Sequence, residues 1–144
     1  MVEQDTVRLL RECDAGVKMG VSSIGEVMER IESPEFRRVL TESRRKHDEL
    51  DRELRQELAR CGDQGKAPNP MAKGMSWMKT NAMLMMKPGD QTIADLMTDG
   101  CNMGVKSLHK YLNQYQAADE NAKEITKKLV NLEQKLAVDL RSFL

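Results

Sequence analysis

Apolar residues recur at helical spacing along most of the chain. Between residues 5 and 31 the apolar positions are Leu10, Val17, Val21, Ile24, Met28 and Ile31. These intervals place the side chains on one face of an amphipathic helix, which we predict for this segment. Asp14 occupies a position on that face where another apolar residue would be expected.

The next segment begins with a helix start signal. Ser33 is suited to an N-cap, Pro34 to the first helical position and Glu35 to the positive end of the helix dipole. The apolar face that follows is interrupted twice by polar residues and consists of Phe36, Leu40, Ser43, His47, Leu50, Leu54 and Leu58. We predict a second helix that ends near Cys61-Gly62.

Residues 62–70 are rich in Gly, Pro, Asp and Asn, which is typical of a loop long enough to cross one end of a helical bundle.

A short third helix is predicted over residues 71–87 from Met71, Met75, Met78, Ala82 and Met85, spaced i, i+4, i+7, i+11 and i+14. Pro88-Gly89 stops this helix. A restart capped by Asp90 or Thr92 carries Ile93, Leu96, Met97, Gly100, Gly104, Leu108, Tyr111 and Tyr115 on one side. We interpret both pieces as one bundle position.

The last segment has the most regular apolar face in the chain. Between residues 118 and 144 the face consists of Ala122, Ile125, Leu129, Leu132, Leu136, Leu140 and Phe143, with Asp119 or Gln116 near its start. Three predicted helices are each roughly 40 Å long, and matched lengths suit an up-and-down bundle. We therefore predict that residues 1–144 form one all-α domain, an antiparallel four-helix bundle with its third helix broken near Pro88-Gly89.

The charge of the chain makes some partners improbable. Basic and acidic residues number 23 each, so the formal net charge is zero and no overall field would attract a polyanion. The basic run Arg44-Arg45-Lys46-His47 is followed at once by acidic residues at 48, 49 and 51. We expect no nucleic-acid partner, because a nucleic-acid footprint is a stripe of one sign. Neither a signal peptide nor a membrane span is evident, so we expect a cytoplasmic protein without a membrane partner.

The cysteines and glycines do not suggest catalysis. Cys13, Cys61 and Cys101 are far apart and outside any CxxC spacing, which suggests neither a disulfide framework nor a thiolate zinc site. Cys13 adjoins Asp14, whose charge raises a thiol pKa, and we expect Cys13 and Cys101 to be buried apolar groups. Glycines at 16, 20 and 25 are interpreted as close contacts between helices. We do not expect an enzyme.

Three stretches carry a resemblance to a known superfamily. They are His-Asp-Glu-Leu at 47–50 and onward to Gly62, Met-Ser-Trp-Met-Lys at 75–79, and Leu-His-Lys-Tyr-Leu at 108–112. With a helical hairpin, a crossing loop and a second hairpin, they resemble the ferritin-like superfamily, which includes proteins similar to rubrerythrin and bacterioferritin. The similarity extends to a bacterial ferritin-like domain family of unknown function. It implies a ferritin-like bundle over nearly the whole chain.

The resemblance also implies where a di-iron centre would lie, and the chain departs from that pattern. Active members use one Glu on each of two helices and a Glu-x-x-His pair on each of the other two. Here Arg44 stands three residues before His47, Leu136 three residues after Glu133, and Gly104 at the matching position of the restarted helix, with Asp99 one turn away. The candidate ligands that remain are Asp14, His47 and Glu133. We expect no cofactor, with vestigial iron or manganese binding as the alternative.

The methionines allow two interpretations. The methionines of this segment, with Trp77 in their midst, form either a plastic apolar surface for another protein or a set of soft thioether ligands for Cu(I). They are Met71, Met75, Met78, Met83, Met85 and Met86, and the protein-binding surface would consist of Met71, Met75, Met78 and Trp77. No His or Cys lies beside them in the sequence, so we favour the protein-binding surface. His109 is expected to be a solvated side chain.

These observations favour a non-catalytic bundle with a structural or protein-interaction role. We expect a homo-oligomer, because apolar faces rich in Met and Gly need to be covered. The alternative is a degenerate ferritin-like metalloprotein that binds iron or manganese through Asp14, His47 and Glu133.

Overall fold

The computed structural model describes residues 3–144, and they are almost entirely helical. The helices are α1 (Gln4–Val27), α2 (Pro34–Arg60), α3 (Pro70–Met86), α4 (Asp90–Gln114) and α5 (Glu120–Leu140). Short 3-10 turns follow α1 at Met28–Arg30 and α5 at Arg141–Phe143. No strand occurs within the described range, so the prediction of an all-α fold is confirmed.

The ends of the helices follow from local chemistry. Ser33 caps α2 by accepting a hydrogen bond from the backbone N–H of Phe36 at 3.2 Å, and Pro34 occupies the first turn, as predicted. Asp119 caps α5 by accepting from the N–H of Ala122 at 2.8 Å. These side chains satisfy backbone donors that have no partner within the helix.

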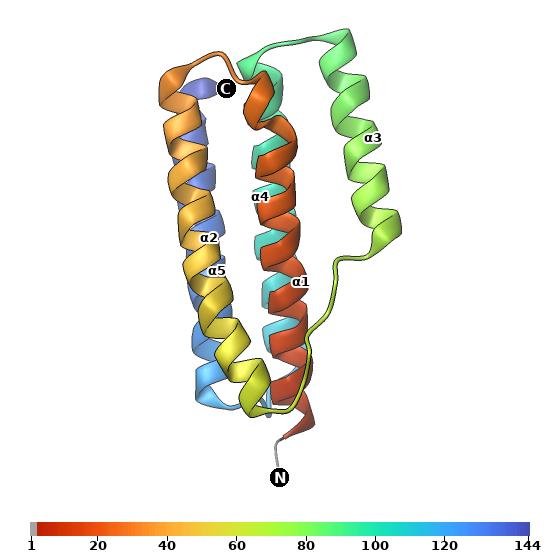
Figure 1. Ribbon diagram of the computed structural model, residues 1–144, viewed down its shortest axis with the longest axis vertical. Coiled ribbons are helices and arrows are strands. Elements are labelled where there is room, and N and C mark those ends of the chain that lie inside the picture. The colour runs from red at the N-terminus through yellow and green to blue at the C-terminus, as the bar shows by residue number, and fades with distance from the viewer. Residues whose placement is uncertain (1–2) are drawn as a thin grey trace.

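Helices α1, α2, α4 and α5 pack side by side as a bundle (Figure 1). Helix α2 runs antiparallel to α1, and α5 runs antiparallel to α4. Helices α2 and α4 run in the same direction, so the chain must return along the bundle between them. Residues 61–89, which include α3, make this return connection.

The prediction of one broken third helix is wrong. Helix α3 lies outside the four packed helices and runs antiparallel to α4, so the two pieces do not share one bundle position (Figure 1). Gly89 has a φ of +122°, a conformation that permits the chain to reverse between α3 and α4. Only Leu84 of α3 is buried, so most of α3 is not held by the core.

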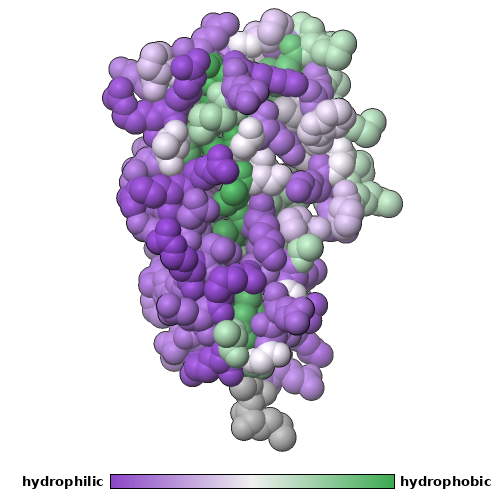
Figure 2. Space-filling view, viewed as in Figure 1, coloured by the Kyte–Doolittle hydropathy of each residue, from purple (hydrophilic) through white to green (hydrophobic). Residues whose placement is uncertain are grey.

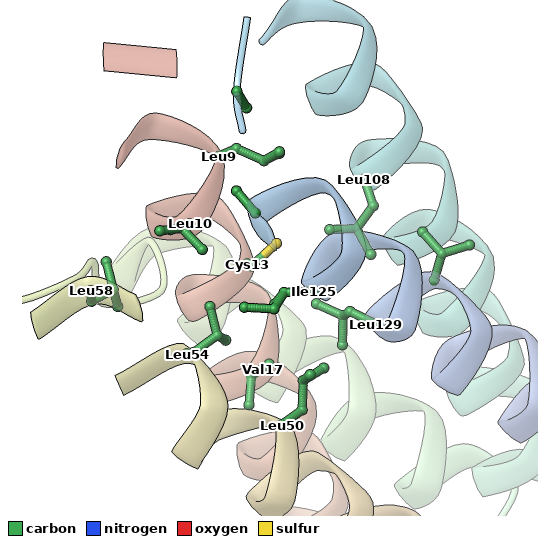
Figure 3. Close-up of a cluster of buried hydrophobic side chains, with 13 residues drawn as sticks. Leu9, Leu10, Cys13, Val17, Leu50, Leu54, Leu58, Leu108, Ile125 and Leu129 are labelled. Atoms are coloured by element: carbon green, nitrogen blue, oxygen red, sulfur yellow. The ribbon is translucent and has the colours of Figure 1, made fainter. Parts of the chain in front are cut away.

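The core consists of two apolar clusters, one in each half of the bundle. The cluster nearer the N-terminus is centred on Leu9, Leu54 and Leu129 (Figure 3). The other contains Ile24, Phe36 and Leu140, and Leu84 of α3 belongs to it. Burial of such side chains is worth about 1.5–3 kcal/mol each, so these clusters hold the four helices together.

Candidate functional site

A polar layer lies between the two apolar clusters. It is formed by Gly20 of α1, His47 of α2, Gly104 of α4 and Glu133 of α5. A Cβ atom added at Gly20 would lie 2.8 Å from Nε2 of His47, and one added at Gly104 would lie 3.8 Å from Cγ of Glu133. Gly20 therefore leaves the space that the His47 ring occupies, which confirms the expected close contact there, whereas a Cβ at Gly104 would make only an ordinary contact. The same expectation is wrong for Gly25, where an added Cβ would meet no atom within 4 Å.

The hydrogen bonds of His47 determine its protonation. Nδ1 donates to the backbone carbonyl of Ser43 at 2.8 Å, and Nε2 lies 2.9 Å from Oε1 of Glu133. A carbonyl and an ionised carboxylate can only accept hydrogen bonds, so both ring nitrogens must carry protons beside an ionised Glu133. The arrangement suits an imidazolium–carboxylate ion pair joining α2 to α5.

Burial and the carboxylate act in opposite directions on the pKa of His47. Burial of the ring lowers it, but the hydrogen bond and charge of Glu133 raise it, and the bond to Ser43 adds to the rise. The net result is a pKa above the ordinary value of 6.5. Cys101 of α4 is also buried, and its pKa is raised by that burial and by the charge of Glu133. Its thiol is thus protonated, which agrees with the expectation of a buried apolar group.

Asp14 has entirely different surroundings. Its side chain is fully buried, and Oδ2 accepts hydrogen bonds from Nζ of Lys18 at 3.0 Å and from the backbone N–H of Lys66 at 2.9 Å. The guanidinium of Arg55, from α2, pairs with Oδ1. Asp14 thereby fixes the segment after α2 to the surface of α1 and α2.

Gly65 is required at this contact. A Cβ atom at Gly65 would lie 2.1 Å from Oδ2 of Asp14, and its φ of +89° is a left-handed conformation. Two further ion pairs flank the contact, Lys66 with Glu12 at 2.6 Å and Arg11 with Asp63 at 3.5 Å. The segment is therefore attached to the bundle by charge as well as by backbone fit. We call this arrangement the Asp14 clamp.

The structure brings together two of the three candidate metal ligands. His47 and Glu133 are in contact, whereas Asp14 precedes Gly20 by six residues, which is about 9 Å along a helix. Arg44, which stands where the resemblance would place a carboxylate, is exposed and does not enter the polar layer. Across residues 3–144, no three His, Cys, Asp or Glu side chains are grouped so that they could hold a metal ion.

Helix α3 has six exposed methionines, of which Met83 is only 37% exposed and the other five lie largely in solvent. Met71, Met75, Met78, Met85 and Met86 are each between 65% and 85% exposed. At 100° per residue they fall within roughly 100° of arc on the helix. We call these five residues the methionine stripe. Figure 2 shows hydrophobic colouring along the outer edge of α3, away from the bundle.

The remaining faces of α3 differ from the stripe. Leu84 is buried against the bundle, and Asn81 accepts a hydrogen bond from Arg30 through its side-chain oxygen at 2.5 Å. Trp77 is 54% exposed, but it follows Met75 by two residues and so points roughly 160° away from it. The predicted surface of Met71, Met75, Met78 and Trp77 is thus exposed, with Trp77 on a different face from the methionines.

Several residues of these sites escaped the sequence pattern. Arg55 and Lys66 bind Asp14, and Gly65 passes close to it, yet all three lie on polar faces and in loops where charge and glycine are common. Their nearest signal was Asp14 itself, since a buried carboxylate requires partners. His109 is exposed and Cys13 is buried, as expected, and burial raises the pKa of the Cys13 thiol to about 11.

Comparison with known proteins gives a similar fold. No family model matches the chain, and no curated protein matches it. A crystal structure of a DUF305 fragment from Deinococcus radiodurans superposes with a TM-score of 0.76 and 12% sequence identity. The match covers 98% of this chain and 95% of that one. At this identity the similarity concerns the helical fold alone.

The helices have no membrane-spanning character. In the part of the chain that the structure describes, none combines the length and the apolar composition needed to cross a bilayer.

Proposed function

We propose that the protein is a non-catalytic helical bundle with a structural or interaction role, and that it associates with a second copy of itself through the methionine stripe. The observation that carries this proposal is the position of the stripe. Five highly exposed methionines share one face of a helix that gives only Leu84 to the core. Contiguous apolar surface of this kind is typical of protein interfaces.

The spacing of α3 favours a helix as the contacting element. Met71, Met75, Met78, Ala82 and Met85 alternate intervals of four and three residues, which is the period of a coiled-coil seam. Methionine side chains are flexible, so such a seam can adapt to an irregular partner. In a dimer with a two-fold axis, α3 of each copy would pack against a helix of the other copy's bundle, so the same surface is buried on both copies.

The charge distribution favours a second copy of this chain. Residues 64–89 contain four lysines and no acidic residue. Because the chain has 23 basic and 23 acidic residues in total, the rest of it carries 19 basic and 23 acidic residues. The bundle of each copy is therefore complementary in net charge to the α3 segment of the other, and this attraction should weaken with added salt.

The proposed dimer has no covalent link between its two copies. It is therefore in equilibrium with the monomer and should dissociate on dilution.

We also propose that the bundle is ferritin-like. The parallel direction of α2 and α4 supports this, because it requires one long crossover, as ferritin-like bundles have. The contact of His47 with Glu133 between the two apolar clusters favours the alternative function, a degenerate iron or manganese protein. The glycines that face this pair from α1 and α4 have no side chain that could bind a metal ion, so we prefer the interaction role.

Sedimentation velocity across a range of protein concentrations tests the proposed self-association. The wild-type chain should shift from monomer to dimer as concentration rises, and a chain with Met71, Met75, Met78 and Met85 replaced by Gln should stay monomeric. Met103→Gln is the matched control, since Met103 of α4 is 70% exposed but lies outside α3. A wild-type chain that remains monomeric at all concentrations, or a dimer that survives the four substitutions, contradicts the proposal.

Metal analysis separates the two functions. Protein purified without chelator should contain no stoichiometric iron or manganese if the interaction role is correct. Stoichiometric metal that is lost in a His47→Ala variant would instead establish the metalloprotein.

A further inference from the structure

We propose that the methionine stripe is a modification site for hydrogen peroxide, and that its oxidation controls the self-association proposed above. The effect on self-association rests on the proposed function, whereas the oxidation of the methionines does not. It starts from the exposure of five thioethers on one face of α3, between 65% and 85% each. Peroxide can reach these sulfur atoms without any opening of the fold.

The chemical step needs only the peroxide. A lone pair on the methionine sulfur attacks one peroxide oxygen, the O–O bond breaks and a sulfur–oxygen bond forms. The sulfur loses two electrons, the proton of the transferred hydroxyl passes to the departing hydroxide, and the products are a sulfoxide and water. Sulfoxide formation converts a flexible apolar side chain into a polar one, and reductases specific for each sulfoxide epimer reverse it.

Exposure divides the methionines into two classes. Met28 and Met97 are partly buried against the apolar cluster that contains Phe36, so they should react more slowly than the stripe. The stripe should react first, with Met85 and Met86 as its most exposed members. Met103 is as exposed as the stripe and should be oxidised at a similar rate, but it lies on α4 and gives a comparison outside α3.

The fold should tolerate this oxidation. The stripe points away from the bundle, and α3 contributes only Leu84 to the core. Polar oxygen atoms on the five sulfurs would therefore leave the packing of α1, α2, α4 and α5 intact. They would remove the apolar character of the seam, so the effect of peroxide falls on association and not on folding.

The first measurement is independent of association. Dilute monomeric protein is treated with hydrogen peroxide, and the time course at each methionine is followed by tandem mass spectrometry of proteolytic peptides. The stripe should be oxidised well before Met28 and Met97. Equal rates for the stripe and for these two partly buried methionines would overturn the inference.

The second measurement tests control of association. Oxidised wild-type protein should dimerise roughly tenfold or more weakly in sedimentation velocity, with an unchanged melting temperature, and methionine sulfoxide reductases should restore the dimer. A variant with all five stripe methionines replaced by Leu keeps the apolar seam without oxidisable sulfur, so its dimer should resist peroxide. The Met103→Gln variant should respond as the wild type does.

The two proposals fail in different ways. A chain that never dimerises but oxidises first at the stripe contradicts the proposed self-association and leaves the modification site supported. A chain whose dimer withstands complete oxidation of the stripe contradicts the control proposed here and leaves the self-association supported.

Discussion

Asp14 and His47 carry the same signal in the sequence but have different surroundings in the structure. Each is a buried ionisable side chain on an otherwise apolar helix face, and each lies beside a glycine that leaves it room. Asp14 binds cationic side chains and the backbone after α2, whereas His47 binds a carboxylate between the packed helices. A polar residue in an apolar face thus indicates burial, while the neighbouring elements decide what it does.

The Asp14 clamp should be the more sensitive of the two sites to added volume. We expect Gly65→Ala to lower the free energy of unfolding by about 3 kcal/mol, because the new Cβ displaces the buried carboxylate and the backbone is left-handed. Chemical denaturation measures the change. Gly62→Ala is the matched control, since Gly62 also has a positive φ of +70° but open space around it, and it should cost only about 1 kcal/mol. Equal losses would show that backbone conformation alone, not Asp14, requires Gly65.

The polar layer should respond less strongly to the same kind of change. Gly20→Ala would place Cβ against the His47 ring and separate it from Glu133, but the helix gains about 1 kcal/mol from alanine, so we expect a net loss of about 2 kcal/mol. Gly25→Ala in the same helix meets no atom within 4 Å and should stabilise by about 1 kcal/mol. Thermal unfolding of both variants measures the difference. If Gly20→Ala also stabilises, the layer is not tightly packed.

The smallest expected effect is a dependence of stability on pH that arises from the His47–Glu133 pair. The pKa of His47 is raised in the folded state above the value of 6.5, so its contribution to stability is complete below pH 6.5 and is lost as the pH rises through the folded-state pKa. Melting temperatures of wild type and His47→Gln, measured over a pH series, isolate this term by difference. The melting temperature of the wild type should exceed that of His47→Gln at low pH, and this difference should shrink as the pH rises through the folded-state pKa of His47. Parallel curves would mean that His47 is not charged.

The helices themselves were largely predictable from the sequence. The period of apolar residues located all five helical segments, and the Ser33-Pro34 signal placed the start of α2 correctly. The burial of Asp14, Ser43 and His47 also followed from their place on apolar faces. Their partners did not, because partners depend on the relative height of neighbouring helices, which a periodic pattern along one helix does not contain.

The position of α3 was the main failure. Its methionine period is that of a buried helix, so it was assigned to the bundle together with the segment after Pro88-Gly89. A periodic apolar face shows that something can cover it but not whether the cover belongs to the same chain. The periodic pattern also does not show that α2 and α4 run in the same direction. It therefore does not show that the residues between them are needed to return the chain along the bundle.

The location of Trp77 has a consequence for optical measurements. It is the only tryptophan in the sequence, and it belongs to α3, which lies outside the bundle. Indole fluorescence will therefore follow events at α3, while circular dichroism follows mainly the other four helices. If the unfolding transitions followed by fluorescence and by circular dichroism do not coincide, the difference would reflect the position of Trp77. It would not by itself establish a folding intermediate.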